Sequence, residues 1–253
     1  MMATDAEGSR NWFERGGQDY ARYRPHYPPA LAAFLATIAA DLRLAVDVGC
    51  GTGQLTRLLA DHFDAVVGLD PSADQIANAT PHARVRYEQA PAEHLPLRDA
   101  SATLVTAAQA AHWFDLPAFH REVRRIGAPA CVLALISYGI PELDADLDAR
   151  FKRFYHHEIG PYWPPERQLV DSGYATMAFP FAEIPAPAIR IELDWDLPAF
   201  LGYLSTWSAV HRAREAGRAD LLHDFAEALA RQWGDAAHRR TVAWPVNMRV
   251  GRL

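Results

Sequence analysis

Apolar and amphipathic segments alternate through the middle of the chain. Five short runs have the length of single strands, and they lie at 44–48, 65–69, 84–88, 102–107 and 130–137. The segments between them repeat apolar residues at helical spacing near 53–61, 72–79 and 115–125. Alternating strands and helices bury both faces of a sheet, so the pattern predicts an α/β fold with a mostly parallel sheet.

Regular spacing also flanks this alternating region. Before it, apolar residues recur every three or four positions at Leu31, Phe34, Leu35, Ile38 and Leu42, which predicts a helix over 29–43, and 11–22 also has a helical pattern. After it, helices are predicted at 143–158, 198–216 and 219–233. Residues 160–190 are rich in proline and aromatic residues, which predicts irregular, packed structure. Ile189–Leu193 and Val242–Val250 are predicted as a closing antiparallel pair of strands.

A glycine-rich turn follows the first strand. Asp47 ends the apolar run, and glycines then alternate at Gly49, Gly51 and Gly53 before the next helix begins. A Cβ at such positions blocks left-handed backbone angles and keeps the main chain away from a ligand. The helix that follows contributes free N–H groups and a partial positive charge. The turn is therefore predicted to hold a nucleotide-like cofactor.

A second carboxylate ends the next predicted strand. Asp70 lies 21 residues after Gly49, where nucleoside-binding α/β folds place an acid on the ribose hydroxyls. The glycine spacing is G-x-G-x-G, which differs from the dinucleotide fingerprint, and the Gly-Lys-Ser/Thr of a P-loop is absent. Because both nicotinamide and adenosyl cofactors carry ribose, Asp70 alone does not choose between them.

Five ordered motifs resemble those of class I S-adenosylmethionine (SAM) methyltransferases. They are Asp47–Gly53, Gly68–Ser72, Ala90–Pro96, Asp99–Gln109 and Phe119–Ile126. More narrowly, Tyr23-Arg24-Pro25-His26-Tyr27-Pro28 is similar to a signature of the type 11, trans-aconitate-methyltransferase-like members. The chain departs from the family at Gly127–Ala130, which replaces Lys-Pro-Gly-Gly, and at Thr103, which replaces an aspartate.

The resemblance implies a fold, a cofactor and a domain plan. The fold is a Rossmann-like, doubly wound and mostly parallel seven-stranded sheet with helices on both faces. SAM is the implied cofactor, held by a core at 44–138. We expect a single domain over 1–253, since no repeat or low-complexity linker interrupts it. A helical and irregular substrate cap is expected from 139–187 and 198–233.

The resemblance and the strand ends together predict a cofactor-binding set. Its members are Tyr20, Arg24, Asp47, Gly49, Cys50, Gly51, Gly53, Asp70, Pro71, Gln75, Ala92, Glu93 and Gln109. Asp70 is expected to accept both ribose hydroxyls. Asp47 is expected to orient the glycine turn or meet the methionine amino group, and a purely structural role is an alternative. Arg24 is expected to bind the methionine carboxylate, or else to belong to a strap that packs on the domain.

Methyl transfer from SAM is an in-line displacement, so the protein chiefly aligns the reacting atoms and needs no catalytic triad. His112, just beyond the fourth predicted strand, is the candidate catalytic residue, as a proton acceptor or as a hydrogen-bonding partner of a substrate carboxylate. A structural histidine is the alternative. The candidate substrate pocket consists of Trp113, Tyr138, Tyr155, Trp163 and Trp207, some of which are alternatively core residues.

Composition narrows the class of partner. The net charge is −6, and acidic residues interrupt the arginine-rich stretch at 121–125, which disfavours a nucleic-acid partner. No apolar run approaches the ~18 residues of a membrane span. The first residues lack an apolar signal segment, and the two cysteines, Cys50 and Cys131, lie on different predicted elements, so a reduced cytoplasmic setting is expected. No metal-ligand spacing is present, and adjacent histidines at 156–157 point apart on a helix.

The sequence thus predicts an enzyme that methylates a small molecule at oxygen, nitrogen or carboxylate oxygen. The alternatives are an RNA or protein methyltransferase, disfavoured by the missing basic appendage, and a non-catalytic SAM-binding protein. The acceptor and the oligomeric state are left open.

Overall fold

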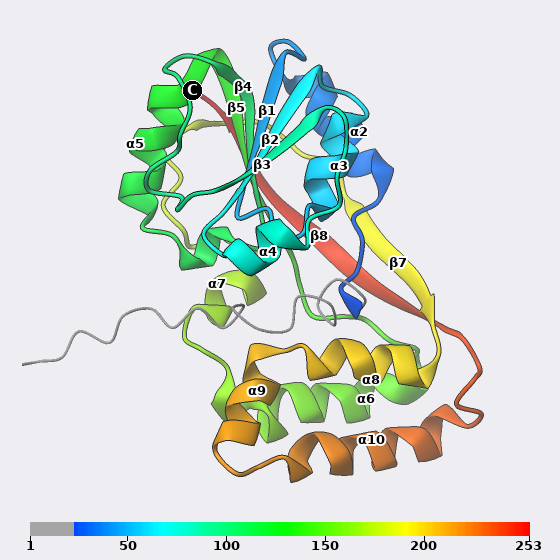
Figure 1. Cartoon of the computed structure of the whole chain (residues 1–253). Coiled ribbons are helices and arrows are strands. Elements are labelled where there is room, and N and C mark those ends of the chain that lie inside the picture. The colour runs from blue at the N-terminus through cyan, green and yellow to red at the C-terminus, as the bar shows by residue number, and fades with distance from the viewer. Residues whose placement is uncertain (1–22) are drawn as a thin grey trace, which may run out of the picture.

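The computed structural model describes residues 23–253. The predicted helix at 11–22 and the candidate Tyr20 lie outside these residues. The described chain forms one twisted sheet flanked by helices, with a further layer of helices beyond the sheet's carboxyl edge (Figure 1).

The sheet follows the order β3-β2-β1-β4-β5-β8-β6, and β7 also pairs with β8. The strands are β1 Leu44–Val48, β2 Ala65–Asp70, β3 Val85–Gln89, β4 Ala102–Ala108, β5 Gly127–Tyr138, β6 Ala182–Glu183, β7 Ile189–Trp195 and β8 Arg240–Arg252. The first five are parallel to one another, and β8 runs antiparallel to β5, β6 and β7. The Rossmann-like, mostly parallel fold is confirmed. This order contains the seven strands that were expected, and β7 is an eighth strand that pairs with β8.

The helices follow the predicted pattern with two corrections. They are α2 Pro29–Ile38, α3 Gln54–Ala60, α4 Ala73–Ala77, α5 Leu116–Ile126, α6 Ala145–Arg153, α7 Arg167–Asp171, α8 Leu197–Ser205, α9 Ser208–Glu215 and α10 Asp220–Trp233. The helix predicted over 29–43 ends at Ile38, and Leu42 is exposed rather than part of its buried face. The helix predicted over 198–216 divides at Trp207, whose backbone is extended.

Long strands join the sheet to the outer helical layer. The second half of β8 pairs with β5, while its first half pairs with β7, so a two-stranded ribbon leaves the sheet and reaches the outer helices (Figure 1). In this layer α10 packs against both α6 and α8. The layer therefore lies over the carboxyl end of β5, where α/β folds bind ligands.

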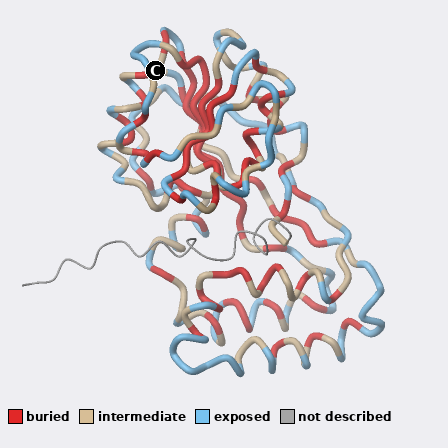
Figure 2. Tube along the Cα trace, in the orientation of Figure 1, coloured by how far each residue is buried: buried red, intermediate tan, exposed pale blue. Residues whose placement is uncertain are grey.

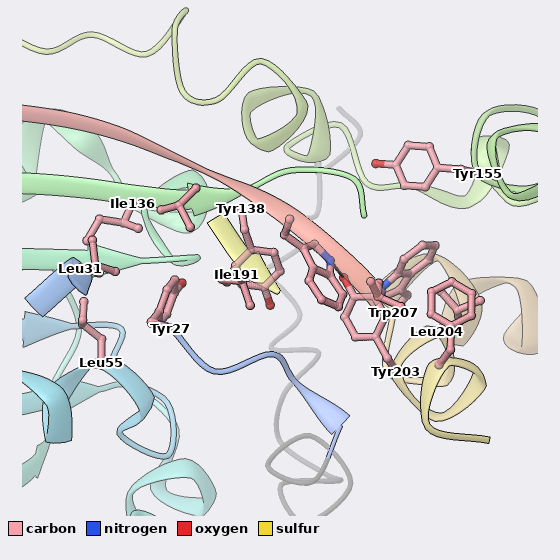
Figure 3. Packing of buried hydrophobic residues seen from close by; sticks show 14 of the residues in the cluster. Tyr27, Leu31, Leu55, Ile136, Tyr138, Tyr155, Ile191, Tyr203, Leu204 and Trp207 are labelled. Atoms are coloured by element: carbon pink, nitrogen blue, oxygen red, sulfur yellow. Dashed lines mark hydrogen bonds between the residues drawn. The ribbon is translucent and has the colours of Figure 1, made fainter. Parts of the chain in front are cut away.

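Two apolar cores cover the faces of the sheet. Strands β1, β2, β4 and β5 are buried along most of their length, whereas β3, β6 and β7 are mainly half-buried or exposed (Figure 2). One core, on the α5 side, includes Phe119, Val123 and Leu133. The other runs without a break from Leu31 and Leu55 through Ile136 to the aromatic residues of the helical layer (Figure 3). Because one core is shared, the layer is fixed to the sheet by burial of apolar side chains.

No helix in the described part of the chain has the length and apolar composition needed to span a membrane.

Candidate functional site

A cavity of about 350 Å³ lies at the carboxyl ends of β1, β2 and β4. This volume is within the usual range for a small-molecule site. Its lining comes from the glycine turn, the end of β2, the loop after β3, the end of β4 and the strap before α2. The lining residues are Arg24, Pro25, Tyr27, Gly49, Cys50, Gly51, Gln54, Asp70, Pro71, Gln75, Pro91, Ala92, Glu93, Ala108, Gln109, Ala110, Trp113, Phe114 and Tyr138.

The glycines of the turn serve different needs. Gly49 has φ of +70°, and a Cβ there would collide with the Cβ of Ala110. The turn is held by two hydrogen bonds, from the backbone N–H groups of Gly49 and Cys50 to the Leu69 carbonyl, at 2.7 and 2.9 Å. Gly51 has φ of +56°, but a Cβ there would collide with nothing, because the nearest atom, Gln75 Oε1, would lie 3.6 Å away. The main chain at Gly51 is therefore open to a ligand in the cavity.

Asp70 closes the turn from the neighbouring strand. Its Oδ2 accepts from the Gly51 N–H and its Oδ1 from the Ser72 N–H, both at 2.9 Å. Burial raises the pKa of this carboxyl, while the two backbone N–H groups lower it. Each oxygen of a carboxylate can accept about two hydrogen bonds, so each keeps one acceptor position. Asp70 lines the cavity and can offer those positions to a ligand.

Asp47 lies behind the turn and is absent from the cavity lining. Its two carboxyl oxygens accept from the hydroxyls of Thr56 on α3 and Thr106 on β4, both at 2.7 Å. Burial raises its pKa to about 6 against the lowering effect of these hydroxyls. The arrangement joins β1, α3 and β4, which favours the loop-orienting role over direct contact with a cofactor.

Two glutamines place unpartnered acceptors at the cavity. Gln109, at the end of β4, has φ of +53°, a conformation that L residues rarely adopt. Its Nε2 donates to the Tyr138 carbonyl at 3.1 Å. Oε1 of Gln109 and Oε1 of Gln75 are buried without a hydrogen-bond partner in the described chain. Buried acceptors without partners are costly, so both atoms suit a ligand that carries N–H or O–H donors.

The far end of the cavity is formed by Arg24, Trp113 and Tyr138. The Arg24 guanidinium donates from Nη1 to the Tyr138 hydroxyl at 3.2 Å and from Nη2 to the Thr206 carbonyl at 3.4 Å. Thr206 lies at the break between α8 and α9. Arg24 therefore connects the cavity to the helical layer, and it adds a positive charge at this end.

His112 lies on η1 Ala111–Trp113, next to the cavity residue Trp113 but outside the lining. Its Nδ1 is 2.9 Å from the Tyr174 hydroxyl. Burial lowers the pKa of His112 to about 3, and the charges of Arg167 and Arg24 act in the same direction. The ring is thus neutral at pH 7 and a weak base, which favours a hydrogen-bonding role over proton abstraction.

Some of the predicted site residues line the cavity together, and others lie outside its lining. The cavity brings together Arg24, Gly49, Cys50, Gly51, Asp70, Pro71, Gln75, Ala92, Glu93, Gln109, Trp113 and Tyr138. Outside its lining are Asp47, Gly53, His112, Tyr155, Trp163 and Trp207. At Gly53, φ is +90° and a Cβ would collide with the Tyr87 hydroxyl, so glycine is needed there for packing. Tyr155, Trp163 and Trp207 form a ring cluster in the helical layer, with centroids 5.1 to 5.6 Å apart.

Seven lining residues were missed by the sequence-based prediction. They are Pro25, Tyr27, Gln54, Pro91, Ala108, Ala110 and Phe114. All lie within two residues of a predicted site residue or in the motifs already identified. Extending each motif by its neighbours would have found them.

Known proteins are similar to this chain in sequence and in fold. A family described as a methyltransferase domain matches residues 46–135. A Dictyostelium discoideum protein named "Putative methyltransferase" is 34% identical over 220 residues, which cover 85% of this chain and 84% of that protein. A Saccharomyces cerevisiae protein, "Probable S-adenosylmethionine-dependent methyltransferase CRG1", is 32% identical over 116 residues, or 42% of this chain and 40% of that one.

A solved structure is similar over almost its full length. It is described as a "Putative Type II Methyltransferase" from Anaeromyxobacter dehalogenans, with 45% identity and a TM-score of 0.85. The match covers 91% of this chain and 98% of that one, so both the sheet and the outer helical layer are included.

Proposed function

Because this chain belongs to the SAM-dependent methyltransferases, we propose that it methylates a small molecule at an oxygen, nitrogen or carboxylate oxygen atom. The observation that carries the proposal is the cavity in which the glycine turn and Asp70 meet at one end and Arg24, Trp113 and Tyr138 at the other. One end suits a nucleoside and the other a compact acceptor.

The lining residues fit SAM. We expect Asp70 to accept the two ribose hydroxyls with the acceptor positions that Gly51 and Ser72 leave open. The orphaned Oε1 atoms of Gln75 and Gln109 suit the amino groups of the cofactor. Pro71, Ala92 and Glu93 are expected beside the adenine, Cys50 of the turn against the cofactor, and Arg24 at the methionine carboxylate. Asp47 and Gly53 are expected to support this set from behind, and Tyr20 stays a prediction.

When bound, SAM supplies an electrophilic methyl group for in-line displacement. The chain's own residues then have to align an acceptor with that group and exclude water. Trp113 and Tyr138 are expected to form walls beside the acceptor. We expect neutral His112 to orient it by a hydrogen bond, with its ring fixed by Tyr174. A low pKa makes His112 a poor general base at pH 7, so an acceptor that is already deprotonated suits this site best.

We further propose that 139–187 and 198–233 act as the substrate cap, with Tyr155, Trp163 and Trp207 on its inner side. The shared apolar core that fixes this layer over the carboxyl ends of the strands supports the assignment. A covered site favours a small molecule over RNA or protein, as does the net charge of −6. The finer likeness to trans-aconitate methyltransferases rests on Tyr23–Pro28, from which Arg24, Pro25 and Tyr27 line the cavity. A cytoplasmic setting stays a proposal.

Calorimetry with S-adenosylhomocysteine tests the cofactor site. In Asp70→Asn, the neutral amide loses the charge-assisted bonds to ribose, each of about 1.5–3 kcal/mol, so affinity should fall about 100-fold or more. Asp61→Asn, at the exposed carboxyl end of α3, is the matched control and should bind normally. A thermal melt of each variant separates loss of binding from loss of fold. Unchanged affinity in Asp70→Asn would remove this carboxylate from the cofactor site.

Turnover of methyl-labelled SAM tests the acceptor class. Label should enter a fraction of small metabolites rather than RNA or protein. Incorporation into a macromolecular fraction would contradict the small-molecule proposal, and a protein that binds SAM without any turnover would be a non-catalytic binder.

A further inference from the structure

Arg167 is held in an unusual way by the helical layer. Its side chain is only 16% exposed. Nε donates to the Tyr155 hydroxyl at 2.7 Å and to Asp171 Oδ1 at 2.8 Å. The guanidinium also stacks on the Trp163 ring, 4.6 Å from its centroid. These contacts fix the plane of the group through one nitrogen and one face.

The remaining hydrogen-bonding capacity of Arg167 is unused. A guanidinium has five N–H donors, of which four belong to Nη1 and Nη2. Neither of these nitrogens makes a hydrogen bond to any residue between 23 and 253. Nε1 of Trp163, on which Arg167 stacks, is likewise a buried donor without a partner there. A cluster that is short of acceptors and fixed by packing is suited to a ligand rich in acceptor atoms.

The position of Arg167 places this cluster beside the cavity. Helix α7 packs against η1, which carries His112 and the cavity residue Trp113. The charge of Arg167 acts on His112, Tyr174 and Tyr203, as its effect on their pKa values shows. The charge of Arg24 acts on two of the same groups, His112 and Tyr203. The charges of both guanidinium groups therefore reach the same two side chains, His112 and Tyr203.

Between residues 23 and 253, Arg167 shares its carboxylate partner with Tyr155. Asp171 is the carboxylate bonded to Arg167, and it also accepts from the Tyr155 hydroxyl at 2.8 Å. A bound SAM adds a further positive charge at its sulfonium. An acceptor group near Arg167 and the sulfonium therefore gains electrostatic stabilisation if it brings a negative charge, and planar aromatic side chains favour a flat group.

We propose that Arg167 is a specificity-determining residue that binds a carboxylate of the methyl acceptor through its two terminal nitrogens. This inference rests on the proposed function and names the residue that recognises the negative charge of the acceptor. Bidentate pairing with a guanidinium fixes the plane of a carboxylate as well as its position. Tyr155 and Asp171 act as positioning residues, because they hold Nε and leave the fork open.

Binding of matched acids and amides tests the proposal. The protein saturated with S-adenosylhomocysteine is titrated with benzoate, trans-cinnamate and succinate, and with their amides, while tryptophan fluorescence or heat is recorded. At least one acid should bind ten-fold or more tightly than its amide. If no acid is preferred, or if none binds saturably, the proposal is overturned. Failure to bind S-adenosylhomocysteine at all would instead contradict the proposed function.

A pair of variants assigns the preference to Arg167. Arg167→Gln should weaken the preferred acid ten-fold or more, change its amide less than two-fold and leave S-adenosylhomocysteine affinity unchanged. Arg231→Gln, the matched control, removes an exposed arginine of α10 outside the site, so the acid preference should persist. A preference that survives Arg167→Gln overturns the proposal. Should Arg167→Gln fail to fold, Arg167→Lys keeps the charge without the fork, and equal acid binding in that variant also overturns it.

Discussion

The carboxyl of Asp47 makes a sharp prediction about stability and pH. It is 1% exposed, and burial raises its pKa to about 6 from an ordinary value of 3.8. At pH 7 the native protein therefore contains a buried carboxylate stabilised by the hydroxyls of Thr56 and Thr106. Between pH 4 and 6 the native state binds more protons than the unfolded state. The free energy of unfolding contributed by Asp47 should thus fall as pH rises.

The magnitude follows from the two pKa values. One pKa unit corresponds to about 1.4 kcal/mol, so the shift amounts to about 3 kcal/mol across the whole titration. Part of this stabilisation of the native state is already lost at pH 4.5, because the carboxyl of the unfolded state is mostly ionised there. Between pH 4.5 and pH 7.5 the expected loss is about 2 kcal/mol. The group is buried, so solvent does not screen this effect as it does at the surface.

Urea unfolding of wild type and Asp47→Asn at several pH values measures this contribution. The difference in free energy of unfolding, wild type minus variant, should decrease by about 2 kcal/mol from pH 4.5 to pH 7.5, because the amide does not titrate. Asp64→Asn, which removes an exposed carboxylate just before β2, controls for overall charge. A wild-type minus Asp47→Asn difference that stays constant within 0.5 kcal/mol, on the order of the error of such extrapolations, would refute the reasoning.

Two further predictions concern packing. Gly49→Ala and Gly217→Ala both place a side chain at positive φ, +70° and +74°, but only the first meets a neighbour, Ala110. Gly217→Ala should lower the free energy of unfolding by about 1–2 kcal/mol because of the left-handed conformation. Gly49→Ala should lower it clearly more and should abolish S-adenosylhomocysteine binding. Equal destabilisation of the two variants in thermal melts would contradict this prediction. Phe225→Ala should lower the free energy of unfolding by about 3–5 kcal/mol, because this fully buried ring stacks on Phe154 with ring centroids 4.1 Å apart. A loss below about 1 kcal/mol in urea unfolding would contradict this prediction.

The end of the cavity formed by the glycine turn and Asp70 could be predicted from the sequence because its determinants are local. A buried strand, a glycine turn and a helix lie within Leu44–Ala60, and the ends of parallel strands meet at one edge. The placement of Asp70 beside Gly51 then follows from the pairing of β1 with β2. The prediction that Leu42 belongs to a helix was wrong because local spacing alone does not show where a helix ends. Its spacing fits the apolar face of α2, but the backbone is already extended at Ala39, where the helix ends, and Asp41 then bonds to Arg43 before β1.

The end of the cavity near Arg24 and Trp113 could not be predicted in the same way because its residues meet only through tertiary packing. Arg24, His112 and Arg167 come from three distant segments, and no spacing relates them. Arg167 in particular is one of several arginines near prolines and aromatic residues, and its sequence context gives no reason to select it. What distinguishes it is that, among residues 23–253, Nε has hydrogen-bond partners and Nη1 and Nη2 have none, which is a property of the folded state. Specificity at this site is therefore expected to follow the folded helical layer, while cofactor binding follows the glycine turn.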